Sequence, residues 1–298
     1  MKYLSLFSGI GGFELGIGNK AKCIGYSEVD KYAIQVYNKH FNHKNYGNIT
    51  SIKPTNLPDF DLIVGGFPCQ SFSIAGKRGG FEDTRGTLFF NIAKIARIKQ
   101  PRLLFLENVK GLLSHNEGNT FATIISTLDE LGYDCQWQVL NSKNFGVPQN
   151  RERVFIIGHL RGTSRPEVFP IGQSDKKIRE NNKRNKPTAI YFDDSIPKAK
   201  TRRGRVMDVS GALMATFRGG LAYCIDANYY KGQNHPKKCN RTMVSNGIVY
   251  RRFTPIECER LQGFPDDWTK EIPEKQRYKT CGNAVTVNVI KAIIEKII

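Results

Sequence analysis

The chain lacks the features that would mark a metal-binding, disulfide-rich or membrane protein. Its seven cysteines form no C-x-x-C pair and show no Cys/His spacing suited to zinc, and their odd number argues against full disulfide pairing. No apolar run approaches membrane-spanning length, and the first residues begin a strand instead of the apolar core of a signal peptide. We therefore expect a soluble, metal-free protein of a reducing compartment.

Acidic residues are also scarce. The 298 residues include 45 Lys and Arg but only 27 Asp and Glu, a net charge of +18, and the stretch 160–250 alone holds 18 basic and 7 acidic residues. A solvated basic surface would give such an excess, but its concentration in one third of the chain favours a face that binds nucleic acid. The apolar fraction of 40% is enough for one large domain, or for one domain and a smaller one.

Short apolar strands alternate with helical patterns up to about residue 160, which is typical of an α/β fold built from parallel βα units. Strands are predicted at 3–7, 23–26, 60–64, 103–106, 135–140 and 154–157, and helices from residue 13, after Asp30, and at 88–98 and 284–298. From about 162 to 205 the chain is rich in Lys, Asn and Pro, which indicates a linker and loops leading into a small basic domain. A partly disordered insertion over 172–205 would show the same composition.

Four predicted strands end in glycine-rich or polar turns. The turn 7–12 is rich in glycine, Glu28 follows the second strand, Cys69 follows the third and Glu107 the fourth. Because the carboxyl ends of parallel strands meet in one crevice, we expect these residues to share a site. The turn lacks the last glycine of a G-x-G-x-x-G fingerprint, since position 14 is Glu14, and this weakens a dehydrogenase interpretation.

A thiol and a carboxyl group at neighbouring strand ends suit nucleophilic addition to an electron-poor ring. Cytosine is such a ring, because attack of Cys69 at C6 makes C5 nucleophilic while an acid such as Glu107 at N3 stabilises the developing charge. Arg151 and Arg153 precede another strand and offer guanidinium groups for a base oxygen or a phosphate. A buried structural cysteine and a surface ion-pair cluster are the structural alternatives.

At this point the motifs resemble those of the bacterial DNA (cytosine-5)-methyltransferases of type II restriction–modification systems. The resemblance covers nearly all of the chain except about 163–245, and it rests on five blocks in order: 66–73, 107–109, 149–153, 254–265 and 282–285. It implies a Rossmann-like, S-adenosylmethionine-dependent methyltransferase domain at 1–162 plus 270–298. It also implies a small, irregular, mostly β target-recognition domain at 163–269.

The resemblance implies a reaction and its catalytic residues. The enzyme would transfer a methyl group from S-adenosyl-L-methionine to C5 of a flipped-out cytosine in a short, specific duplex sequence, through a covalent adduct between Cys69 and C6. Glu107 would contact N3 and the exocyclic amine, Arg151 would hold the cytosine O2, and Arg153 would complete the catalytic set. Double-stranded DNA would be the partner of a monomer in the bacterial cytoplasm, at the nucleoid when bound.

The same resemblance assigns binding residues. The cofactor-binding residues would be Phe7, Gly9, Gly11, Gly12, Glu28, Val29, Asn48, Ile49, Pro68, Leu88 and Asn283. The DNA-binding residues would be Gln70, Ser71, Ser73, Arg85, Arg203, Thr216, Arg218 and Tyr229. Family members often carry Asp where this chain has Asn48, and an amide oxygen still accepts a hydrogen bond from the adenine amine. The segment 71–87 resembles a mobile loop that closes over DNA.

Two other functions remain as alternatives. The first is methylation of transfer RNA, which one branch of the family performs with the same catalytic core, although the Cys-Phe-Thr segment of that branch is not apparent here. The second is a non-catalytic DNA-binding regulator, against which the intact Cys69, Glu107 and Arg151 argue. A dehydrogenase is a more distant third.

Overall fold

The computed structural model describes residues 1–68, 88–172 and 253–298, together with 190–191, 205–207, 222–223, 225, 227, 229, 243–245 and 250–251. The chain forms two compact units. Unit 1 comprises Met1–Leu140, Glu152–Ile171 and Val289–Ile298, and unit 2 comprises Asn141–Arg151 and Gly172–Asn288.

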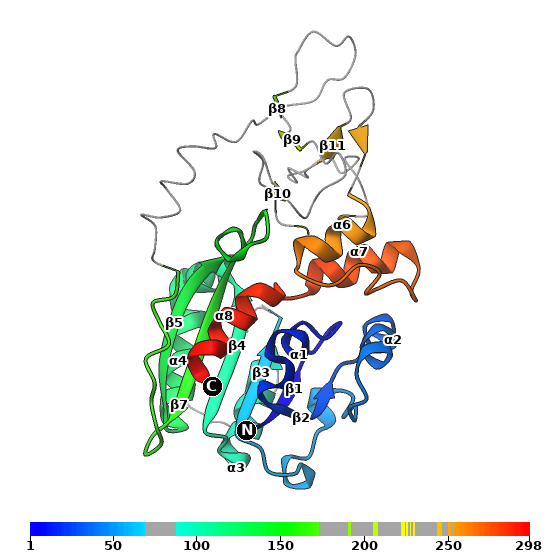
Figure 1. Ribbon diagram of the computed structural model, residues 1–298. Coiled ribbons are helices and arrows are strands. Elements are labelled where there is room, and N and C mark those ends of the chain that lie inside the picture. The colour runs from blue at the N-terminus through cyan, green and yellow to red at the C-terminus, as the bar shows by residue number, and fades with distance from the viewer. Residues whose placement is uncertain are drawn as a thin grey trace. The chain divides into compact units, whose positions relative to one another are not determined.

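Unit 1 is built on a six-stranded sheet with the order β2-β1-β3-β4-β7-β5 (Figure 1). Its strands are β1 (Lys2–Leu6), β2 (Lys22–Ser27), β3 (Leu62–Gly66), β4 (Leu103–Val109), β5 (Tyr133–Asn141) and β7 (Glu152–Leu160). β1 pairs in parallel with β2 and with β3, and β3 pairs in parallel with β4. The carboxyl ends of these four strands therefore lie at one edge of the sheet, as the sequence predicts.

Helices cover both faces of this sheet. Leu104 and Leu106 of β4 belong to one apolar cluster with α3 (Leu88–Lys99) and α4 (Asn119–Glu130). Between them, the Phe105 ring points to the opposite face and meets Phe13 of α1 (Gly12–Ile17), with the ring centroids 5.2 Å apart. A strand that is buried on both faces is apolar at successive positions, which explains the uninterrupted run in β4.

Two further helices confirm sequence predictions. The helix α2 (Lys31–His40) begins after Asp30, whose side chain accepts hydrogen bonds from the N–H groups of Tyr32 and Ala33. The helix α8 (Val287–Ile297) starts three residues later than the predicted 284, and the chain from Val289 onward belongs to unit 1. Its apolar stripe is fully buried at Ile290, Ile293 and Ile294.

The sheet is mixed and not wholly parallel, because β7 runs antiparallel to β4. β5 and β7 are joined by ten residues that form a short 3-10 turn and the two-residue β6, whereas a parallel neighbour would require a crossover of a dozen or more residues. As a result, the amino end of β7 lies beside the carboxyl end of β4, with Arg153 opposite Val109.

The described part of unit 2 contains short strands and two α-helices. One sheet has the strand order β12-β11-β9-β8, and β10 pairs with β6. The elements are β6 (Gln149–Asn150), β8 (Ile190–Tyr191), β9 (Arg205–Met207), β10 (Ala222–Tyr223), β11 (Met243–Ser245), β12 (Tyr250–Arg251), α6 (Pro255–Leu261) and α7 (Glu274–Asn283). The predicted small region of short β-strands is thus present between residues 190 and 251.

The compact units and the predicted domains have different boundaries. Residues 141–151 and 270–288 belong to unit 2, although we predicted them within the catalytic domain. The division of catalysis and DNA recognition between parts of the chain stays a prediction. Within the described ranges, no helix is long and apolar enough to span a membrane, and no group of His, Cys, Asp and Glu side chains could hold a metal ion.

Candidate active site

The loop after β1 adopts backbone conformations that few side chains tolerate. Phe7, Gly9 and Gly11 have φ angles of 54°, 55° and 86°, all in the left-handed region. Among the described residues, a Cβ atom added at Gly9 would have no atom within 4 Å, whereas a Cβ at Gly11 would collide with the ring of Phe41. Gly9 is therefore open to an approaching ligand, and Gly11 is required for close packing. Gly12 begins α1.

Glu28 joins this loop to the end of β2. Its Oε2 accepts a hydrogen bond from the N–H of Gly9 at 2.9 Å, and its Oε1 accepts from the N–H groups of Val29 and Asp30 at 2.7 and 2.8 Å. A carboxylate offers about four acceptor positions, so Glu28 keeps capacity for one further donor. The side chain thus fixes the shape of the loop and still presents an acceptor.

The other residues predicted to bind a cofactor differ in exposure. The Val29 side chain is 66% exposed, whereas Ile49 is 4% exposed and belongs to the apolar core of unit 1. Asn48 uses its side-chain oxygen to accept the N–H of Thr50, which caps the turn Ile49–Ser51. Pro68 is exposed after β3, and Leu88 begins α3 and packs partly on the core.

Glu107 and Arg153 form an ion pair where β4 ends and β7 begins. The Arg153 Nε lies 3.1 Å from the Glu107 Oε1, and these side chains are only 18% and 11% exposed. The antiparallel register of β4 and β7 brings the two groups together across 46 residues of sequence. A carboxylate held by a guanidinium in a largely desolvated position is a strong and oriented electrostatic pair.

Asn108 is a site residue that reasoning from the sequence did not identify. Its Nδ2 donates to the carbonyl oxygen of Phe67 at 3.0 Å, and its Oδ1 accepts the N–H of Val109. Asn108 thereby ties the end of β4 to the segment Phe67–Pro68 that leads directly into Cys69. The signal available in the sequence was its place next to Glu107 in the same motif.

Arg151 is buried within unit 2 and its guanidinium is committed to the main chain. It donates to the carbonyl oxygens of Ile225, Gly282 and Ala284 at 3.0, 3.1 and 2.8 Å. Gln149 acts similarly, donating to the carbonyl of Leu261 and accepting the N–H of Ile225. The Nη1 and Nη2 groups of Arg151 thus serve buried carbonyl groups, and these contacts lend no support to the expectation that Arg151 holds a base oxygen, which stays a prediction.

Tyr229 also differs from its predicted role. Its side chain is 3% exposed, its ring stacks on Phe253, and its hydroxyl accepts the N–H of Phe253 at 3.0 Å. These contacts place it in the interior of unit 2, so we leave it out of the proposed DNA-binding set. Asn283, the last residue of α7, is exposed. The predicted residues Cys69, Gln70, Ser71, Ser73, Arg85, Arg203, Thr216 and Arg218 lie outside the described residues.

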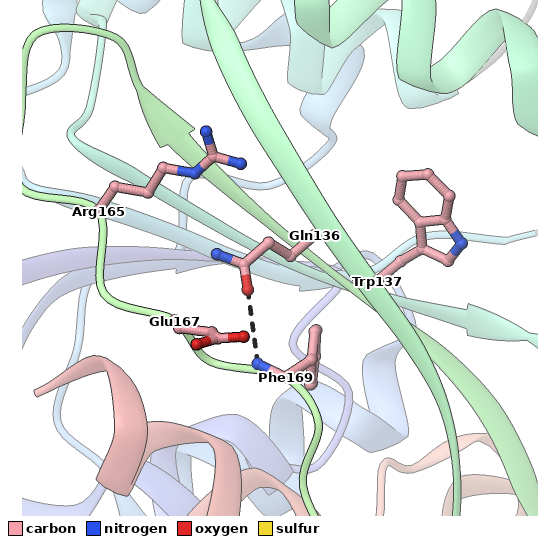
Figure 2. A pocket seen from close by; sticks show the side chains of 5 residues that line it. All are labelled: Gln136, Trp137, Arg165, Glu167 and Phe169. Atoms are coloured by element: carbon pink, nitrogen blue, oxygen red, sulfur yellow. Dashed lines mark hydrogen bonds between the residues drawn. The ribbon is translucent and has the colours of Figure 1, made fainter.

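One pocket of unit 1 lies apart from the predicted site. Figure 2 shows it between β5 and the segment 165–169, lined by Gln136, Trp137, Arg165, Glu167 and Phe169, with a volume of about 510 Å³. The Gln136 Oε1 accepts the N–H groups of Val168 and Phe169, which holds this segment against β5. None of the predicted site residues that the structure describes lines the pocket, and its glutamine has a structural role.

The chain is similar to known proteins over its whole length. Residues 1–298 match the model of a protein family described as C-5 cytosine-specific DNA methylase. The chain is 42% identical over 295 residues to the type II methyltransferase M.NgoBI of Neisseria gonorrhoeae, covering 98% of this chain and 91% of that protein. It is 40% identical over 326 residues to the type II methyltransferase M.HpaII of Haemophilus parainfluenzae, covering 99% and 88%.

A solved structure shares the fold. The chain is similar to the Dnmt2 methyltransferase of S. pombe, with a TM-score of 0.70 at 20% sequence identity over 99% of this chain and 97% of that one. At this identity the likeness concerns the arrangement of helices and strands.

Proposed function

Since this chain belongs to the C-5 cytosine-specific DNA methylase family and is a DNA (cytosine-5)-methyltransferase, we propose that it methylates a flipped-out cytosine through a covalent adduct with Cys69, using S-adenosylmethionine. The observation that carries the proposal is the largely buried ion pair of Glu107 and Arg153, whose Oε1 and Nε atoms lie 3.1 Å apart at the strand ends. The segment that leads to Cys69 is fastened beside it by Asn108.

The proposed chemistry uses a nucleophile and an acid. The Cys69 thiolate adds to C6 of the ring, and the electron pair of the C5–C6 double bond moves towards C5 and N3. Glu107 in its protonated form donates a hydrogen bond to N3 and so stabilises the negative charge that develops there. The carbon C5, now nucleophilic, would then take the methyl group from the sulfonium of the cofactor, whose S–CH3 bond breaks to leave a neutral thioether. A base then removes the proton from C5, the double bond forms again, and the bond between sulfur and C6 breaks to release Cys69.

Arg153 supplies the cation of the site in this proposal. Its Nε holds Glu107 in one orientation, and its Nη1 donates to the carbonyl oxygen of Glu152, so the guanidinium is fixed beside the carboxylate that would meet the ring. From this position it would donate a hydrogen bond to the cytosine O2. We therefore assign to Arg153 the contact that the sequence resemblance had assigned to Arg151. Arg151 becomes a positioning residue that holds the main chain of unit 2 through its three carbonyl contacts.

The residues at the ends of β1 and β2 fit S-adenosylmethionine. The space beside Gly9 admits a ligand to the backbone, Glu28 keeps an acceptor position for a ribose hydroxyl, and the exposed Val29 offers an apolar contact for a base. When bound, the cofactor supplies an electrophilic methyl group. Phe7, Gly11, Gly12, Asn48, Pro68, Leu88 and Asn283 complete the proposed binding set, whereas the buried Ile49 supports it from the core.

The substrate we propose is duplex DNA, with the target base turned out of the stack so that Cys69 reaches the ring face. Flipping costs a few kcal/mol, which contacts in the site offset. The basic stretch 160–250 supports a phosphate-binding face, and Gln70, Ser71, Ser73, Arg85, Arg203, Thr216 and Arg218 remain its proposed contacts.

A covalent trap tests this proposal. Fluorine at C5 of cytosine cannot leave as a proton does, so the adduct with Cys69 should persist on mixed-sequence duplexes that contain 5-fluorocytosine. We expect a complex that survives denaturing electrophoresis in the wild-type protein and in Cys135→Ala, which removes a free, half-buried thiol elsewhere, but not in Cys69→Ala. Trapping by Cys69→Ala would contradict the assignment of the nucleophile, as would methyl transfer without any trapped complex.

A further inference from the structure

A chain of three titratable side chains lies beneath the loop that follows β1. Glu14 of α1 is 3% exposed, and its Oε1 lies 3.1 Å from the hydroxyl of Tyr37 in α2. The same hydroxyl lies 2.9 Å from Nδ1 of His43. Within the described part of the chain, the buried Oε2 of Glu14 makes no hydrogen bond and the carboxyl group makes no ion pair. A buried acid with so few partners is costly to ionise.

The Tyr37 hydroxyl has one hydrogen and can donate in only one direction at a time. When Glu14 is protonated it donates to Tyr37, and Tyr37 donates to Nδ1 of His43. When Glu14 is ionised, Tyr37 donates to Glu14 and accepts a hydrogen bond from an Nδ1–H of His43. The charge on Glu14 therefore sets the direction of both hydrogen bonds and the tautomer of His43.

Burial raises the pKa of Glu14 to about 7, although the hydrogen bond from Tyr37 acts in the opposite direction. This value places the change of charge in the physiological range. Burial also lowers the pKa of His43, which favours the neutral form of the ring.

The other groups that face Glu14 do not titrate near neutral pH. Burial raises the pKa values of Tyr3, Tyr26 and Tyr37, and it raises that of Cys23 to about 12. The exposed Lys22 stands at the rim of the adjoining cavity. Glu14 is therefore the group in this cluster whose charge changes near pH 7.

Phe41 connects these residues to the loop. Its ring stacks on His43 with the centroids 5.7 Å apart, lies 5.0 Å from the ring of Tyr37, and abuts Gly11 so closely that a methyl group there would collide with it. A cavity of about 410 Å³ borders Glu14, Phe41 and His43 and gives these side chains room to shift. A change at Tyr37 and His43 is thus transmitted to the backbone at Gly11.

We propose that Glu14, Tyr37 and His43 form a proton relay that makes cofactor affinity depend on pH. The proposal rests on the proposed binding of S-adenosylmethionine at the Gly9–Gly12 loop. When Glu14 is neutral, the Gly9–Gly12 loop keeps the conformation of the structure, with Phe41 packed against Gly11. Ionisation of Glu14 favours hydration of the carboxylate and displacement of Phe41 from Gly11, so affinity falls as the pH rises.

Carbon-13 NMR of protein labelled at the glutamate carboxyl carbons tests the relay without reference to the cofactor. We expect one resonance with a midpoint near pH 7 that is absent from Glu14→Gln. In Tyr37→Phe the midpoint should move to higher pH, because a donor to the ionised carboxylate is lost. An absent resonance, or an unmoved midpoint in Tyr37→Phe, would overturn the relay.

Calorimetric titration of S-adenosylmethionine at pH 6 and pH 8 tests the consequence. The Kd should rise by about two- to tenfold in the wild-type protein and in the control Glu130→Gln, which changes an exposed residue of α4, but less than half as much in Glu14→Gln. The amino group of the cofactor titrates at about pH 8 with all three proteins and cancels in the comparison. An equal pH dependence of Kd in all three proteins would overturn the relay alone. No binding of S-adenosylmethionine at either pH would overturn the proposed function as well.

Discussion

The guanidinium of Arg153 makes the contact on which the proposed chemistry depends most. It meets Glu107 in a largely buried position, so its removal leaves a desolvated carboxylate without its cation. We expect Arg153→Ala to reduce methyl transfer by about 100-fold or more, which is the scale of losing one preorganised donor in an active site. Arg161→Ala provides the matched control, because that arginine pairs with Asp129 and Asp134 on the surface. Equal activity of the two variants would contradict the role of Arg153.

Glu14 should also leave a signature in stability. Its pKa is about 7 in the folded protein and close to its ordinary value of 4.5 in the unfolded chain, so the folded state binds more protons between these values. Stability is therefore highest below about pH 4.5 as far as Glu14 is concerned, and it falls by up to ~3 kcal/mol as the pH rises to about 7. Urea unfolding of wild type and Glu14→Gln across this range measures the difference, and parallel curves would refute the contribution of Glu14.

The two arginines also show what sequence alone can and cannot predict about a site. Arg151 and Arg153 lie in one motif, and its spacing does not reveal that the chain passes from unit 2 to unit 1 between Arg151 and Glu152. Ile49 is similar, because nothing in its immediate sequence shows that its side chain enters the core while Val29 stays exposed. Such assignments depend on tertiary contacts, which local patterns do not contain.

At the scale of elements, the loop between β1 and α1 offers a matched pair of glycine substitutions. Both Gly9 and Gly11 have positive φ, but a Cβ at Gly11 would meet the ring of Phe41, whereas a Cβ at Gly9 would meet none of the described residues. We expect Gly11→Ala to lose stability by more than about 1 kcal/mol beyond Gly9→Ala, because it adds a collision with Phe41 to the backbone strain. Gly9→Ala should instead weaken S-adenosylmethionine binding more than stability, since its methyl group enters the open space. Thermal unfolding and calorimetry measure both quantities, and the reverse ranking would contradict the proposed loop function.

The elements of unit 1 were predictable because buried strands are short apolar runs that end at glycine or polar residues. β1, β3 and β4 follow this pattern, and the convergence of their carboxyl ends followed from it. The antiparallel direction of β7 could not be predicted from this pattern, because hydrophobic periodicity indicates which residues are buried and not which way a neighbouring strand runs. Only the short connection after β5 could have indicated the reversal.

At the scale of the whole molecule, the charge of +18 should make DNA binding strongly dependent on salt. Each phosphate neutralised contributes a slope of about −0.9 to a plot of log K against log salt concentration. We expect Lys237→Gln/Lys238→Gln, in the basic stretch, to flatten this slope by about 1 to 2. Lys94→Gln/Arg97→Gln on α3 should leave the slope unchanged. Fluorescence anisotropy between 50 and 200 mM salt measures it, and equal slopes for both double variants would contradict a DNA face in 160–250.

The most direct test of the account is transfer of labelled methyl groups from S-adenosylmethionine to mixed-sequence duplex DNA, followed by mapping of 5-methylcytosine at single-base resolution. The account predicts label on cytosine C5 at one recurring short sequence, and none with Cys69→Ala. Absence of label from DNA, with the fold intact and the cofactor bound, would contradict it. Label on RNA in a parallel reaction would then identify the true substrate.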